Sequence, residues 1–152
     1  MANKGSGGAP AILVGGLTAG ILDIADAFVF FGLRGAKPLR ILQSIASGLL
    51  GPKAYSGGWS TAILGGALHF SIAITAAAVY YFASRKLTFL KRSPVLSGLL
   101  YGVAVYLFMN AVVLPLSNFR TTTPSGSVLV NGLLAHMFLV GLPISLAVRR
   151  WG

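Results

Sequence analysis

The chain has 152 residues, a formal net charge of +10 and a mean hydropathy of +0.82, and 55% of its residues are hydrophobic while only 9% are charged. This balance excludes an ordinary water-soluble domain and predicts an all-α integral membrane protein. Because the sequence contains no cysteine, it also excludes disulfides, thiolate metal sites and a cysteine nucleophile.

Four predominantly apolar segments are each long enough to cross about 30 Å of hydrocarbon as a helix. They span residues 11–33, 61–83, 94–114 and 128–148. We therefore expect a single four-helix transmembrane domain over residues 11–150, preceded by a flexible, Gly-rich tail at residues 1–10. A signal peptide is the competing interpretation of the first segment, but two aspartates would interrupt its apolar region.

Residues 38–50 predict an extra amphipathic helix after the first span. One side of this helix holds polar residues and the other holds apolar ones: Arg40, Gln43, Ser44 and Ser47 against Leu42, Ile45 and Leu49. Together, Arg34, Lys37 and Arg40 form a basic cluster suited to anionic lipid head groups at the membrane interface. A helix lying on the lipid surface is the simpler interpretation, and a functional lid or re-entrant segment is the alternative.

The other basic residues also flank the apolar segments, so the charge predicts lipid head groups and not nucleic acid as partners. If the N-terminus is inside, the inner side carries seven basic residues and the outer side five. The seven are Lys4, Arg85, Lys86, Lys91, Arg92, Arg149 and Arg150, and the five are Arg34, Lys37, Arg40, Lys53 and Arg120. This difference favours an N-in, C-in protein of a bacterial inner membrane.

Asp23 and Asp26 are the only acidic residues of the protein, and both lie inside the first apolar segment. An ionised carboxylate at the centre of a membrane helix costs about 2.5–3.5 kcal/mol on insertion scales. The two residues are three positions apart on one helix face, next to the small residues Gly16, Gly20 and Ala27. We therefore expect both carboxylates to point into the helix bundle.

A weak internal repeat relates the two halves of the chain. Gly16-Leu17-x-x-Gly20 recurs as Gly98-Leu99-x-x-Gly102, and Gly65-x-x-x-His69 recurs as Gly132-x-x-x-His136. This predicts two helix pairs in parallel topology, with chance recurrence of glycine as the competing explanation. The Gly-x-x-x-Gly spacings are typical of close helix packing.

Counting along the alternating spans places four ionisable side chains at a similar depth below one membrane face. These are Asp23, Asp26, His69 and His136, with Asn110 just above them. Such a set can hold a proton or small cation, and its carboxylates and imidazoles are also candidate ligands for a metal. The alternatives are that the aspartates only lock the bundle by hydrogen bonds and that each histidine only joins two helices.

The second half of the chain resembles the YagU-like family of bacterial inner-membrane proteins. The resemblance rests on His69-Phe70-Ser71, Val79-Tyr80, the run from Gly98 to Leu116, and a final His136 helix ending in Arg149-Arg150. It implies a membrane protein linked to acid resistance, and it provides no catalytic residues.

The function that these patterns favour is a small polytopic membrane protein whose buried Asp/His site binds or passes a proton or small cation, in transport or acid stress. An enzyme is less favoured, because no nucleophile elbow is visible. One alternative is a non-catalytic subunit that packs, through glycine-rich faces, into a homo-oligomer or a larger membrane complex. Another is a metal- or haem-binding redox protein with His69 and His136 as axial ligands, although the sequence requires no cofactor.

Overall fold

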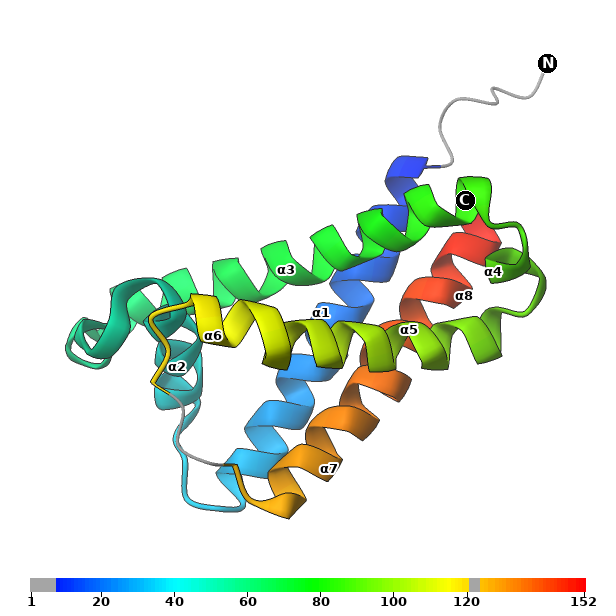
Figure 1. Ribbon diagram of the computed structural model, residues 1–152. Coiled ribbons are helices and arrows are strands. Elements are labelled where there is room, and N and C mark those ends of the chain that lie inside the picture. Colours follow the sequence, from blue (N-terminus) through cyan, green and yellow to red (C-terminus); the bar gives the residue numbers. More distant parts are fainter. Residues whose placement is uncertain (1–7, 121–123) are drawn as a thin grey trace.

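The computed structural model describes residues 8–120 and 124–152 (Figure 1). Within these residues, four helical segments are long and apolar enough to cross a membrane: Gly8–Gly32, Gly58–Lys86, Pro94–Leu116 and Gly126–Trp151. They confirm the four predicted spans and the all-α, multi-pass membrane fold. Of the predicted tail, residues 8–10 belong to the first helix, and residues 1–7 lie outside the described part.

The third and fourth spans are each divided into three consecutive helical elements, whereas the first and second are single helices. The elements are α1 (Gly8–Gly32), α2 (Pro38–Leu50), the 3-10 helix η1 (Gly51–Ser56), α3 (Gly58–Lys86), α4 (Phe89–Arg92), α5 (Pro94–Phe108), the π-helical turn η2 (Met109–Val113), α6 (Leu114–Leu116), α7 (Gly126–Ala135), the π-helical turn η3 (His136–Gly141) and α8 (Leu142–Trp151). Large apolar side chains such as Leu116 and Ile63 are exposed on the outer faces, where they contact lipid.

The bundle has two ends that differ in packing (Figure 1). The α2 end carries α2, η1, α6 and the start of α7, while the α4 end carries α4, the start of α1 and the end of α8. Near the α4 end the interior is filled by a core that α1, α3, η3 and α8 share, and this core includes Tyr80, Ile144 and Val148. The hydroxyl of Tyr101 donates a hydrogen bond of 2.7 Å to the Ala76 carbonyl and links α5 to α3. The α4 end is therefore the closed end of the bundle.

The predicted amphipathic helix forms over the expected residues, but its polar side faces protein. Gln43 and Ser47 are only 2% and 3% exposed, whereas Leu49 is 56% exposed. Gln43 Nε2 donates a hydrogen bond of 3.0 Å to the carbonyl of Gly58 at the start of α3. Part of the polar side of α2 thus contacts α3, because the first residues of α3 offer a carbonyl that a polar side chain can pair.

Two tight turns let α2 fold back against α3. Gly35, with φ of +90°, follows α1, and Gly51, with φ of +62°, ends α2. A residue with a side chain rarely adopts such positive φ values, so glycine is needed at both turns.

Glycine contacts within the two helix pairs follow the predicted repeat. A Cβ on Gly16 would collide with Ile74, and a Cβ on Gly98 would lie 3.0 Å from the Gly141 carbonyl. Ile74 and Gly141 each lie five positions after the histidine of their half (His69 and His136). The Gly-x-x-x-Gly segments therefore pack inside the chain, in the same register in both halves.

Candidate functional site

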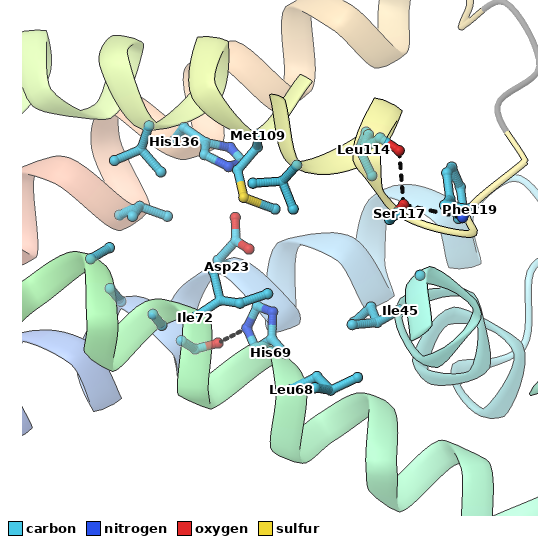
Figure 2. Close-up of a pocket in the computed structure, with 18 of the residues that line it drawn as sticks. Asp23, Ile45, Leu68, His69, Ile72, Met109, Leu114, Ser117, Phe119 and His136 are labelled. Atoms are coloured by element: carbon cyan, nitrogen blue, oxygen red, sulfur yellow. Dashed lines mark hydrogen bonds between the residues drawn. The ribbon is translucent and has the colours of Figure 1, made fainter. Parts of the chain in front are cut away.

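A cavity of about 440 Å³ lies between the helices, and residues of α2 form part of its wall. Every spanning helix and α2 contribute to its wall (Figure 2). Most of the lining is apolar, and its ionisable side chains are Asp23, His69 and His136. Three of the five predicted site residues thus meet at one cavity.

The two histidines are each oriented by a backbone carbonyl. His69 Nε2 lies 2.8 Å from the Gly20 carbonyl, and His136 Nδ1 lies 2.8 Å from the Gly132 carbonyl. A carbonyl oxygen only accepts, so the ring nitrogen facing it must carry the hydrogen. The remaining nitrogens, Nδ1 of His69 and Nε2 of His136, are left to accept a proton or a ligand hydrogen bond.

The two aspartates have different surroundings. Asp26 Oδ2 accepts a hydrogen bond of 2.7 Å from Asn131 Nδ2 on α7. Asp23 makes no hydrogen bond to any of the other described residues, and its carboxylate projects into the space between the His69 and His136 rings (Figure 2). Asp26 is therefore tied to the bundle, while Asp23 is open to the cavity.

Two π-helical turns, η2 and η3, form part of the cavity wall that comes from the second half of the chain. In each, the leucine before a proline donates its N–H to the carbonyl five residues earlier: Leu114 to Met109 and Leu142 to Met137. The next residue in each case is a proline, Pro115 or Pro143, which has no N–H to continue the four-residue pattern. Residues of these turns that line the cavity are Met109, Val113, His136 and Val140. In the fourth span, Pro143 thus follows a local change of helix pitch.

A second, smaller cavity of about 230 Å³ lies beside the first. Asp23 and His136 line both cavities, while Asp26, Asn110 and Asn131 line only the smaller one. The polar residues that were predicted to form one site are therefore divided between two adjacent cavities.

The predicted Asp/His cluster differs from the structure in three respects. Asp23, Asp26, His69 and His136 are half-buried rather than buried, and within residues 8–120 and 124–152 no hydrogen bond joins a histidine to an aspartate. Among the same residues, no group of three or more such side chains could hold a metal ion, so the proposed metal ligands do not assemble. Asn110 is exposed and donates its amide hydrogen to the Tyr106 carbonyl of its own helix.

Asn131, the hydrogen-bond partner of Asp26, was not predicted as a site residue. It lies three positions after the start of the predicted fourth span, a depth similar to that of Asp26, seven positions before the end of the first span. The same depth count that selected the histidines could have found it. Ser44, Ser117 and Phe119 also line the larger cavity and were not predicted as site residues.

Arg34, Lys37 and Arg40, the basic cluster expected to meet lipid head groups, are all exposed. The Arg34 guanidinium lies 3.6 Å from the centre of the Phe30 ring, and Arg40 donates to the Tyr55 carbonyl at 3.2 Å. None of the three lines either cavity, so they do not neutralise Asp23 directly.

Comparison of the chain with protein-family models, with curated proteins and with solved structures gives no match. The resemblance to the YagU-like family therefore has no support from these comparisons.

Proposed function

We propose that this multi-pass membrane protein binds or passes a proton or small cation at the cavity that Asp23, His69 and His136 line. The observation that carries the proposal is the difference between the two aspartates. Asp26 has a hydrogen-bond partner on another helix and so resembles a structural lock, whereas Asp23 faces a cavity and has no such partner among residues 8–120 and 124–152. A carboxylate placed in a membrane helix at a cost of a few kcal/mol is usually functional when no partner offsets that cost.

The imidazoles support a proton more than a metal. Each ring has one nitrogen engaged with a carbonyl and one nitrogen available, and imidazole exchanges protons near neutral pH. Both rings line the same cavity as Asp23, so proton transfer over a short distance needs only water or small side-chain movements.

The larger-complex alternative is less supported by the packing. Its sequence basis was the glycine-rich helix faces, yet Gly16, Gly20, Gly98 and Gly102 contact other helices of the same chain. Those faces are therefore not free to receive a partner helix. Location in a bacterial inner membrane with both termini inside, and a role in acid stress, remain parts of the proposal that rest on the charge count and the family resemblance.

The test is proton flux into sealed vesicles that contain the purified protein and a trapped pH-sensitive dye. We expect Asp23→Asn to reduce the flux to that of empty vesicles and Asp26→Asn to retain most of it. Equal flux in the wild type and in Asp23→Asn, at equal protein content, would exclude Asp23 as the carrier of the proton.

A further inference from the structure

We infer that the larger cavity binds a monovalent organic cation, a protonated amine with an apolar body, and that Asp23 accepts a hydrogen bond from its ammonium group. The inference rests on the proposed function, because it gives the exchangeable carboxylate a second ligand besides the proton. The observation that supports it is that the accessible Asp23 carboxylate lies in a cavity whose walls are otherwise mostly apolar.

The size of the cavity argues for an organic ligand. Its volume of about 440 Å³ falls within the range of small-molecule sites, roughly 300–1,000 Å³. Leu68, Ile72 and Met109 supply apolar surface around the centre, and Phe119 supplies an aromatic ring near the α2 end (Figure 2). An apolar body would replace water along these walls, which a bare ion cannot do.

The polar groups of the wall argue against an inorganic cation. Na⁺, Mg²⁺ and Ca²⁺ need several oxygen ligands to replace their water. Apart from Asp23, the side-chain oxygens of the lining are the hydroxyls of Ser44 and Ser117, which are fewer oxygens than these ions need. An ammonium group needs fewer partners, and the Asp23 carboxylate with the available imidazole nitrogens can accept its hydrogens.

Protons should compete with this cation. The titratable groups that face Asp23 around the larger cavity are His69 from α3 and His136 from η3, while the lining residues of α2, α5, η2 and α6 carry no charge. Asp26 and Tyr106 face it across the smaller cavity. Protonation of Asp23 removes the negative charge that attracts the ammonium, and protonation of either histidine adds a like charge that repels it. Cation affinity should therefore fall as the pH is lowered.

The experiment measures binding of 4-phenylbutylamine to the whole purified protein by calorimetry, with 4-phenylbutanol as the uncharged ligand of the same shape and NaCl as a competitor. We expect the amine to bind roughly 10- to 100-fold more tightly than the alcohol, because only the amine offers a charged hydrogen bond. Asp23→Asn should reduce amine affinity to that of the alcohol and leave alcohol affinity unchanged. Asp26→Asn is the matched control, since it removes the neighbouring carboxylate one helical turn away, and it should keep the preference for the amine.

Equal affinity for amine and alcohol in the wild type would overturn the inference, and so would displacement of the amine by Na⁺. It would also be overturned if Asp26→Asn lost the preference for the amine to the same degree as Asp23→Asn. Proton flux measured without amine separates the two proposals. If Asp23→Asn abolishes that flux but the amine does not bind, the organic cation is wrong and the proton role stands. If the amine binds through Asp23 but no flux depends on it, the proton role is wrong and the binding site stands.

Discussion

Asn131 donates a hydrogen bond of 2.7 Å to Asp26, and this contact joins α7 to α1 across 105 positions of the sequence. It lies at the α2 end, where the tightly packed core of the α4 end does not reach. It is therefore a polar link between the first and the fourth spans, beside the smaller cavity.

Asn131→Ala should destabilise the protein, because it leaves a half-buried carboxylate without its donor. Hydrogen bonds to charged groups contribute about 1.5–3 kcal/mol in soluble proteins, and those within membranes contribute about 0.6–2 kcal/mol. We expect the free energy of unfolding in detergent to fall by about 1–2 kcal/mol. Thermal melting measures this, and Asn118→Ala, which removes a hydrogen bond to the Leu49 carbonyl rather than to a carboxylate, is the comparison for loss of an asparagine.

Asp23→Asn should have the opposite effect on stability, because Asp23 has no partner among the described residues to lose. Replacing an unpaired carboxylate in a membrane helix by an uncharged amide removes a desolvation cost. The melting temperature should stay level or rise while the proton flux disappears. A clear fall in melting temperature would indicate that Asp23 too is a structural lock.

The spans, and the presence of Asp23, His69 and His136 at one cavity, could be predicted from the sequence, because both follow from hydrophobic length and from the rise per residue. Rotation about the helix axis could not be predicted in this way. Asp23 and Asp26 share a helix face in the sequence, yet one opens to the larger cavity and the other pairs with Asn131. The contact of Gln43 with α3 could not be predicted either, since it depends on the position of the Gly58 carbonyl in space.

Gly65 and Gly66 are neighbours on α3 and give a matched test of how α2 docks. A Cβ on Gly65 would collide with the Leu42 carbonyl of α2, whereas a Cβ on Gly66 would find only the tip of the Leu42 side chain at 4.0 Å. Gly65→Ala should lower the free energy of unfolding by about 1–3 kcal/mol, the usual cost of overpacking. Gly66→Ala should be neutral or should stabilise by up to about 1 kcal/mol through helix propensity. Similar melting temperatures for the two variants would contradict the packing of α2 on α3.

The absence of cysteine from the sequence makes topology directly testable with single-cysteine variants. Lys53 at the α2 end and Lys86 at the α4 end are both exposed. If both termini are inside, a membrane-impermeant maleimide should label Lys53→Cys in intact cells and Lys86→Cys only after the membrane is opened. The reverse pattern would place the cavities on the cytoplasmic side, and labelling of both variants in intact cells would contradict the four-span fold.

Pro143→Ala tests whether the π-helical turn η3 positions His136. An alanine restores the missing N–H, which can donate to the carbonyl of Leu139 four residues earlier, so the turn can revert to α-helix. Reversion removes the extra residue of the π turn and rotates the side chains on one side of it by about 100° relative to those on the other. His136 would then leave the cavity while α8 keeps its packing.

For Pro143→Ala, we expect the proton flux to fall and the melting temperature to stay level or rise. Pro10→Ala, at an exposed position in the first turn of α1, is the control and should leave both quantities unchanged. Normal flux in Pro143→Ala would mean that proton passage does not depend on how η3 orients His136.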